Sequence, residues 1–260
     1  MEETTLKYQL YSDLHLEFTN IFPRLTPIAD ILILAGDIGK VTTRLYKEFI
    51  IYCSLNWRHV IVVLGNHEFY INHSMTSIKN SYFKFFDKFD NVHLLDGTYF
   101  KIDNTVIYGF TAWTKSIFNS KTIAQQYLND YNRIKTTKGA ITPGFINELS
   151  THEINQFREF TEKVNNGEIE CENVIVVTHF PPISSNTSSP EYENGILSGY
   201  YSWTNLLKYE DVKCDKIKIW CSGHTHWSYD FKKSGVRYLS NQIGYPGENI
   251  AFNADLVFTL

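Results

Sequence analysis

The chain has no apolar run that approaches the ~20 residues of a membrane-spanning helix. Its first seven residues, M-E-E-T-T-L-K, are acidic and polar, unlike the basic and then apolar start of a secretory signal. Four cysteines occur without a C-x-x-C pair, which indicates small buried side chains in a reducing compartment and not disulfides. We therefore expect a soluble, cytoplasmic protein with no membrane partner.

An excess of positive charge is also missing. The formal net charge is −4 over 260 residues, so the basic surface that a non-specific nucleic-acid binder needs is not indicated. Nucleic acid is therefore disfavoured as a partner, although a nuclease that reads a short substrate stays open. No Pro/Gly/Ser-rich linker divides the chain, and its length suits one domain over residues 1–260. Nothing in the sequence indicates an oligomeric state.

Short runs rich in β-branched residues recur along the chain and predict strands. Two of them, I-L-I-L-A and V-I-V-V, are apolar on both faces, as in a sheet that is covered on both sides. The expected strands are Leu6–Tyr11, Asp30–Ala35, Val60–Leu64, Thr105–Phe110, Asn173–Thr178, Lys216–Cys221, Val236–Ser240 and Leu256–Leu260.

The stretches between several of these runs are amphipathic and predict helices. Strand, helix and strand alternate up to about residue 95, which favours parallel pairing, whereas the closely spaced strands of the last third favour antiparallel pairing. The segment Phe180–Pro190 is typical of a functional or mobile loop. The expected helices are Thr42–Asn56, Asn72–Phe89, Ile146–Val164 and Ser202–Tyr209.

Five of the predicted strands are followed by side chains that bind metals. In D-x-H and H-x-H, a spacing of two places both side chains on one face of an extended segment. Ligands of open α/β sheets bind at the carboxyl ends of strands, so these residues predict one common site. They are Asp13 and His15 in S-D-L-H, Asp37 in G-D, Asn66 and His67 in G-N-H-E, His179 in T-H, and His224 and His226 in G-H-T-H. The other histidines are expected to be structural: His59, His73, His93 and His152.

These five motifs, in this order, resemble those of the calcineurin-like metallophosphoesterases. S-D-L-H-L-E-F, G-N-H-E-F-Y, G-F-T-A-W-T, D-Y-N-R-I and N-Q-I-G-Y-P-G-E-N resemble a bacterial and phage branch over essentially the whole chain. The resemblance implies an α/β fold, a four-layer α/β/β/α sandwich of two mixed β-sheets flanked by helices. It also implies two divalent transition-metal ions at the strand ends.

The resemblance assigns a role to each motif residue. It implies a first ion held by Asp13, His15, Asp37 and His226, and a second held by Asp37, Asn66, His179 and His224. Asp37 would bridge the ions, a bridging hydroxide would attack the phosphate ester, and His67 would be the general acid. The histidines favour Mn or Fe, with Zn as the alternative.

The substrate is less well determined than the site. A small, nucleotide-like phosphodiester is favoured over a phosphoprotein, because G-D-I-G-K and L-G-N-H-E lack the arginines of protein phosphatases of this superfamily. A phosphomonoesterase or a nuclease is the alternative. A non-catalytic scaffold is disfavoured because every ligand position is present.

Residues outside the five motifs are candidates for binding the substrate. Arg133, Tyr70 and Asp130 could contact the phosphate ester, and the turn G-Y-P-G-E-N at 244–249 could line the cleft. Phe180 stands where many relatives carry a second histidine, so substrate handling is expected to differ there. Several aromatic residues could stack a nucleobase, although packing is the more common use of such rings: Tyr70, Trp113, Tyr200, Tyr201, Trp203 and Trp227.

Overall fold

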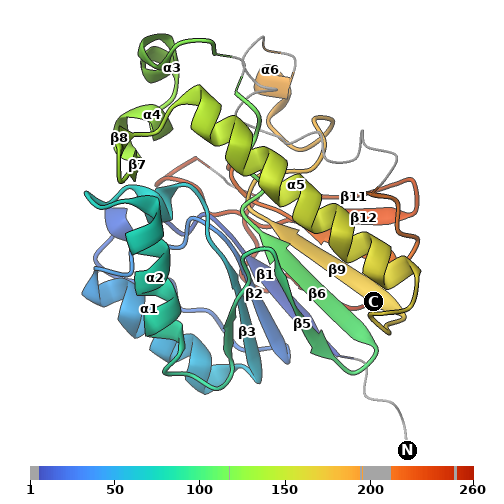
Figure 1. Ribbon diagram of the computed structural model, residues 1–260. Coiled ribbons are helices and arrows are strands. Elements are labelled where there is room, and N and C mark those ends of the chain that lie inside the picture. The colour runs from blue at the N-terminus through green and yellow to red at the C-terminus, as the bar shows by residue number, and fades with distance from the viewer. Residues whose placement is uncertain (1–5, 117, 194, 196–211, 249–250) are drawn as a thin grey trace, which may run out of the picture.

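Two mixed β-sheets pack against each other, and helices cover their outer faces (Figure 1). The computed structural model describes residues 6–116, 118–193, 195, 212–248 and 251–260. In the first sheet β1 to β4 are parallel and β13 pairs with β1 in the antiparallel sense. Its order is β13-β1-β2-β3-β4, with β1 at Tyr8–Tyr11, β2 at Ile31–Ala35, β3 at His59–Val63, β4 at Val92–Leu94 and β13 at Val257–Phe258.

The second sheet has four parallel strands, β6, β9, β10 and β12, between two antiparallel edge strands. Its order is β11-β12-β10-β9-β6-β5. The strands are β5 (Thr98–Ile102), β6 (Thr105–Phe110), β9 (Asn173–Thr178), β10 (Ile217–Cys221), β11 (Tyr229–Lys233) and β12 (Val236–Ser240).

Local signals place the longer helices. α1 (Arg44–Asn56), α2 (Met75–Phe86) and α5 (Pro143–Asn165) each begin after a Ser or Thr whose side chain accepts a backbone N–H, the usual N-cap interaction. α1 and α2 lie over the first sheet and α5 over the second (Figure 1). The shorter elements are η1 (Leu16–Phe18), η2 (His67–Phe69), α3 (Lys121–Tyr127), α4 (Asp130–Arg133), α6 (Pro190–Glu193) and the ribbon β7 (Lys135–Thr136) with β8 (Gly139–Ala140).

Alternate residues of a strand pack into two different parts of the core, because successive side chains point to opposite faces of a sheet. Ile33 of β2 and Ile175 and Val177 of β9 belong to the layer between the sheets. Leu34 of β2 and Val176 of β9 pack on the outer, helix-covered side. Both faces of the central strands are therefore apolar, as their sequences predicted. None of the helices in the described residues has the length and apolar character needed to cross a bilayer.

The predicted α/β sandwich is confirmed, and its inaccuracies are local. The expectation of antiparallel pairing in the last third holds for β11 and β13 and is wrong for β9, β10 and β12, which are parallel. Strands β4, β5 and β11 and the ribbon of β7 and β8 were not predicted. Helix α5 begins at Pro143, before the predicted Ile146, since Thr142 caps it and proline suits the first helical turn. The predicted helix Ser202–Tyr209 lies outside the described residues.

Candidate metal centre

The ends of β1, β2, β3, β9 and β10 meet at one edge of the two sheets, and backbone hydrogen bonds tie the loops that follow them. The N–H of Asp13 donates to Gly36 O and that of His15 to Asp37 O, both at 3.0 Å. The N–H of His67 donates to Oδ1 of Asp37 at 2.8 Å. Five segments that are distant in sequence thus present their polar side chains to one point.

Five of the eight residues that the motifs predicted have backbone conformations in the left-handed region, which non-glycine residues rarely adopt. Their φ angles are 54° at Asp13, 46° at His15, 52° at Asp37, 74° at His224 and 51° at His226. Such conformations cost of order 1–3 kcal/mol each and gather where function requires a particular side-chain direction. Here each one directs a carboxylate or an imidazole into the same buried space.

Two motif glycines are required by close approach. A β-carbon at Gly36, whose φ is +89°, would collide with the ring of His179, and one at Gly65 would collide with the Asp37 carboxylate. The glycines of G-D and G-N-H-E therefore let the ends of β2 and β3 approach His179, which follows β9, so that Asp37 and His179 lie close together.

Potential ligand atoms form three overlapping groups, within each of which they lie no more than 4.8 Å apart. In the described residues the groups are Asp13, His15 and His226; Asp37, His179 and His224; and His15, Asp37 and His67. Each of the first two contains three of the four residues of one implied ligand set: Asp37 is missing from the first group and Asn66 from the second. Oδ2 of Asp37 lies 3.5 Å from Nε2 of His179 and 3.9 Å from Nε2 of His15, so it faces both sets.

The imidazoles are oriented as metal ligands usually are, with one nitrogen bound to the protein and the other turned inward. Nδ1 of His179 lies 3.0 Å from the carbonyl of Ala35, a contact in which Nδ1 donates and Nε2 is left as a lone-pair donor to a cation. Nδ1 of His226 bonds the carboxylate of Glu248. As a result, Nε2 of both rings points into the site.

Contacts inside the site match a cation-binding arrangement. Nε2 of His15 lies 3.0 Å from Nε2 of His226, and two neutral imidazole nitrogens facing each other repel unless a proton or a metal ion lies between them. Burial raises the pKa of Asp37, yet the neighbouring histidines outweigh burial and hold that pKa well below its usual value. The donor set is an ionised carboxylate, imidazoles and an amide oxygen, which suits divalent transition metals.

Asp130 and Tyr70 lie beside Asn66. Oδ1 of Asp130 accepts hydrogen bonds from Nδ2 of Asn66 at 2.9 Å and from the Tyr70 hydroxyl at 2.5 Å. The bond to Nδ2 turns Oδ1 of Asn66 inward, where it lies 3.0 Å from Nε2 of His179. Asp130 therefore determines which atom of the Asn66 amide faces the metal ligands. Burial raises the pKa of Asp130.

His67 lies at the edge of this cluster. Its Nδ1 is 3.0 Å from Oε1 of Glu17, its Nε2 is 3.2 Å from the hydroxyl of Tyr245, and its ring stacks on Tyr70 at 4.3 Å. Burial lowers the pKa of His67, but the charges of Asp37 and Glu17 and the hydrogen bond to Glu17 outweigh it and raise the pKa above the usual value. A protonated His67 is a suitable general acid.

Glu68 is buried and binds the backbone of the loops that follow β2 and β3. It is 1% exposed, and its two oxygens accept four backbone N–H groups, from Asp37 (3.0 Å), Ile38 (2.8 Å), Gly39 (3.2 Å) and Gly65 (2.7 Å). These bonds join the loops that follow β2 and β3. Burial and the Asp37 charge raise the pKa of Glu68 to about 8.

Sequence reasoning did not assign roles to four residues that complete the site: Glu17, Glu68, Tyr245 and Glu248. Each of them lies within a quoted motif, D-L-H-L-E, G-N-H-E or G-Y-P-G-E-N, so the motif itself was the available signal. The prediction that the 244–249 turn lines the site is confirmed for its described part, since the Tyr245 ring lies 4.6 Å from His15 and 4.7 Å from His226.

The other predicted residues have simpler surroundings. Trp113 is buried against Phe69 and Phe180, and Phe180 in turn packs 4.0 Å from the His224 ring. Arg133 is exposed at the end of α4. All four cysteines are free. Tyr200, Tyr201 and Trp203 lie outside the described residues.

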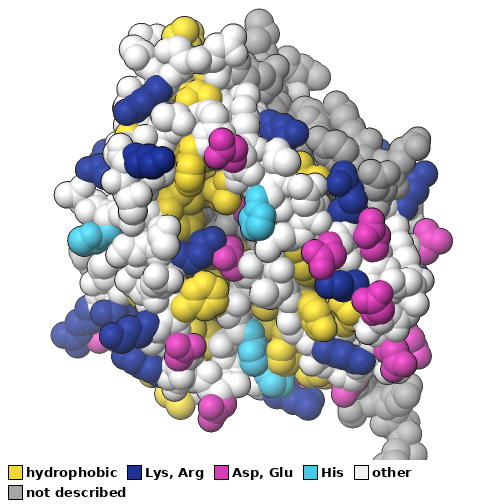
Figure 2. Space-filling view, in the orientation of Figure 1, with side chains coloured by type: hydrophobic (Ala, Val, Ile, Leu, Met, Phe, Trp, Pro, Cys, Tyr) yellow, Lys and Arg dark blue, Asp and Glu magenta, His cyan; other side chains and the backbone are white. Residues whose placement is uncertain are grey.

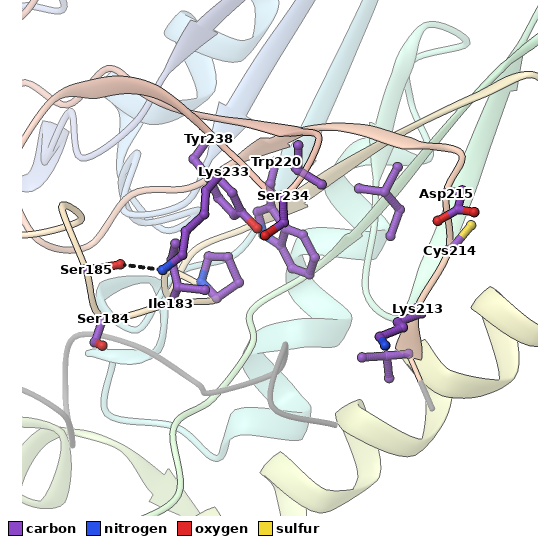
Figure 3. A pocket seen from close by; sticks show the side chains of 14 residues that line it. Ile183, Ser184, Ser185, Lys213, Cys214, Asp215, Trp220, Lys233, Ser234 and Tyr238 are labelled. Atoms are coloured by element: carbon purple, nitrogen blue, oxygen red, sulfur yellow. Dashed lines mark hydrogen bonds between the residues drawn. The ribbon is translucent and has the colours of Figure 1, made fainter. Parts of the chain in front are cut away.

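A cavity of about 670 Å³ lies on the outer face of the second sheet (Figure 3). Trp220 and Tyr238 form part of its apolar lining, and Lys233 donates to Ser185 at its edge at 2.9 Å. Trp220 packs on the helix side of β10, whereas the metal-binding residues follow the strand ends. This cavity is therefore separate from the candidate metal centre.

Comparison with known proteins agrees with this geometry. Residues 9–228 match the family model described as calcineurin-like phosphoesterase, and the chain belongs to that family. It is 26% identical over 272 residues to the uncharacterized protein L509 of Acanthamoeba polyphaga mimivirus, covering 93% of this chain and 92% of that protein.

Two solved structures share the fold. A phosphopantetheinyl hydrolase from Mycobacterium tuberculosis aligns with a TM-score of 0.61 and 17% identity, over 94% of this chain and 91% of that one. A dimetal phosphatase from Danio rerio aligns with a TM-score of 0.54 and 14% identity, over 92% and 87%. The family and the clustered ligands together define a metal-dependent phosphoesterase, a hydrolase acting on phosphate esters.

Proposed function

We propose that the protein hydrolyses a small phosphodiester at a dinuclear metal centre. The observation that carries the proposal is the convergence of two ligand groups, with Oδ2 of Asp37 lying 3.9 Å from Nε2 of His15 in one group and 3.5 Å from Nε2 of His179 in the other. His67 lies beside these groups, with its Nδ1 held by Glu17. The proposed ligands are Asp13, His15, Asp37 and His226 for one ion, and Asp37, Asn66, His179 and His224 for the other.

Two divalent ions bound there would supply the positive charge that orients a phosphate ester and activates water. Water adds its oxygen to phosphorus and releases one proton to solvent, the bond between phosphorus and the leaving oxygen breaks, and solvent returns a proton to His67 after each turnover. His67 gives its proton to that oxygen, which prevents the departure of a free alkoxide. Because Glu17 occupies Nδ1, the proton comes from Nε2. Manganese or iron is the metal that we propose.

The charge distribution supports a small substrate over a nucleic acid. On the face shown in Figure 2, lysine and arginine side chains alternate with aspartate and glutamate and do not merge into one continuous basic surface. Binding a polymeric phosphate backbone needs such a surface. The local charge needed for a single phosphate would instead come from the bound ions.

The test is turnover by purified protein that has been stripped with a chelator and reloaded with Mn²⁺. We expect cleavage of bis-p-nitrophenyl phosphate to be faster than cleavage of p-nitrophenyl phosphate, and we expect Asp37→Ala to abolish both. Faster cleavage of the monoester would replace the proposal with a phosphomonoesterase. Inactivity towards both substrates despite two bound ions would contradict diester hydrolysis of this kind.

A further inference from the structure

An open groove of about 760 Å³ adjoins the candidate metal centre. One side consists of the segment after β1, from Leu14 to Arg24, and another of the turn at Ile243, Gly244 and Pro246. His15, a proposed metal ligand, is one of the lining residues. The groove is thus continuous with the place where a phosphate would bind.

The groove lies on the side of His67 from which the proton would leave. Nε2 of His67 faces the hydroxyl of Tyr245 at 3.2 Å, and the neighbours of Tyr245 in the chain, Gly244 and Pro246, line the groove. The ring of Phe18, also in the lining, lies 6.2 Å from that of His67 and 5.5 Å from that of Tyr245. The leaving oxygen of the substrate would receive this proton. The organic group attached to that oxygen would then lie at the inner end of the groove.

The lining is mostly hydrocarbon. Ile21 is 77% exposed and Phe18 57% exposed, so both present apolar surface to the groove. The charged residues in the lining are Arg24 and Glu48, and Glu48 already accepts from Nε of Arg44 at 2.6 Å. One arginine does not provide the cationic cluster that a polyphosphate or polynucleotide chain needs.

We infer that this groove binds the leaving group of the substrate, and that the preferred substrates are phosphate esters of bulky hydrophobic alcohols or phenols. The inference rests on the proposed function, since it uses His67 to locate the leaving oxygen. The inference goes beyond the proposed function because it assigns substrate specificity to residues 18–24 and to Ile243, Gly244 and Pro246. None of these is a proposed metal ligand or the proposed proton donor.

The test measures binding, without turnover. Methylphosphonate and (1-naphthylmethyl)phosphonate carry a carbon–phosphorus bond in place of the bond to the leaving oxygen, so neither is hydrolysed there. Calorimetric titration of the Mn²⁺-loaded protein should show that the naphthylmethyl compound binds more than about tenfold tighter, because the groove removes its rings from water.

The matched variants are Ile21→Asp and Leu55→Asp. Both positions are similarly exposed, at 77% and 79%, but Leu55 lies on α1 outside the groove. Ile21→Asp should reduce the preference for the naphthylmethyl compound roughly five- to tenfold, through loss of apolar contact, and leave methylphosphonate affinity unchanged. Leu55→Asp should change neither affinity.

Equal affinity for the two phosphonates, or no measurable binding of either, would overturn the inference. A preference that survives both Ile21→Asp and Phe18→Ala would also overturn it, since the rings would then bind elsewhere. Failure of the proposed function would be seen in a different experiment, as absence of diester cleavage in the turnover assay. The binding of the two phosphonates can be interpreted whether or not the diester is cleaved.

Discussion

Nδ1 of His67 lies 3.0 Å from Oε1 of Glu17, although 50 residues separate them in the chain. Burial would raise the pKa of Glu17, but its hydrogen bonds with His15 and His67 outweigh burial and lower it to about 2. The carboxylate is therefore charged and holds the imidazole with Nε2 turned to Tyr245. The pair is a carboxylate–histidine arrangement in which Glu17 orients the proposed general acid.

Removing that orientation should slow the reaction selectively. We expect Glu17→Ala to reduce turnover about tenfold to a hundredfold on esters with poor leaving groups and much less on p-nitrophenyl esters, which depart without a proton. Glu17→Gln keeps an oxygen that accepts from Nδ1 and should restore part of the rate. Equal losses for good and poor leaving groups would contradict the orienting role.

The proposed roles of His67 and Asp37 can be distinguished by measuring metal content and turnover rate in the same variants. We expect His67→Ala to retain both ions and lose ~10²–10⁴ in turnover on poor leaving groups, since only the proton donor is missing. Asp37→Ala should lose metal as well, because Oδ2 faces both ligand sets. Metal content from elemental analysis is the measurement, and a parallel loss of metal in both variants would contradict these roles.

Asp130 should act on metal affinity through Asn66. Without Asp130, Nδ2 of Asn66 keeps only its longer contact with the Tyr70 hydroxyl at 3.3 Å, and the amide can turn its oxygen away from His179. We therefore expect Asp130→Ala to weaken one of the two Mn²⁺ sites ~10–100-fold. Asn132→Ala, an exposed position on the same short helix, is the control. Titration of the metal-free protein measures both sites, and two unchanged affinities would disprove the role.

Glu68 should contribute mainly to stability. Glu68→Gln replaces one acceptor oxygen by an NH₂ group that faces two backbone N–H donors, and we expect the free energy of unfolding to fall by ~2–4 kcal/mol. Urea unfolding of the metal-free protein at about pH 9 is the measurement, because Glu68 is ionised above its pKa of about 8 and both of its oxygens then accept hydrogen bonds. Glu162→Gln, at an exposed position of α5, should change it by less than about 0.5 kcal/mol. A similarly small change at Glu68 would show that the four bonds contribute little.

Glu153 should make stability depend on pH. Burial raises its pKa to about 8, although Oε2 accepts from the Trp113 N–H at 2.7 Å. Since the pKa in the unfolded chain is near 4.5, the folded state holds this proton more tightly. The stabilisation is complete below about pH 4.5 and is lost as pH rises towards about 8.

The expected loss from Glu153 between about pH 4.5 and pH 8 is on the order of 5 kcal/mol in the free energy of unfolding. Glu153→Gln should flatten this slope, whereas Glu162→Gln on the same helix should leave it unchanged. Unfolding curves of the metal-free protein at several pH values supply the comparison. An unaltered slope in Glu153→Gln would show that other groups cause the pH dependence.

The sequence determined the sheets and the list of candidate ligands. Runs such as I-L-I-L-A and V-I-V-V carry their strand signal locally, and polar residues directly after them belong to the same few residues of chain. Parallel strands bring their carboxyl ends to one edge, so a common site followed from local patterns alone. The parallel direction of β10 and β12 did not, because pairing between strands distant in sequence has no local signature.

Only the tertiary structure decided which side chains hold the ligands in place. The Glu17–His67, Glu68–Gly39 and Asp130–Asn66 contacts join residues 29 to 64 positions apart. Each depends on distance and direction between loops, which residue type and spacing do not encode. The same holds for the groove beside His15, whose walls come from residues 14–24 and 243–246. The sequence thus specified the chemistry of the site, and the folding of separate strand ends against one another specified its orientation and its opening.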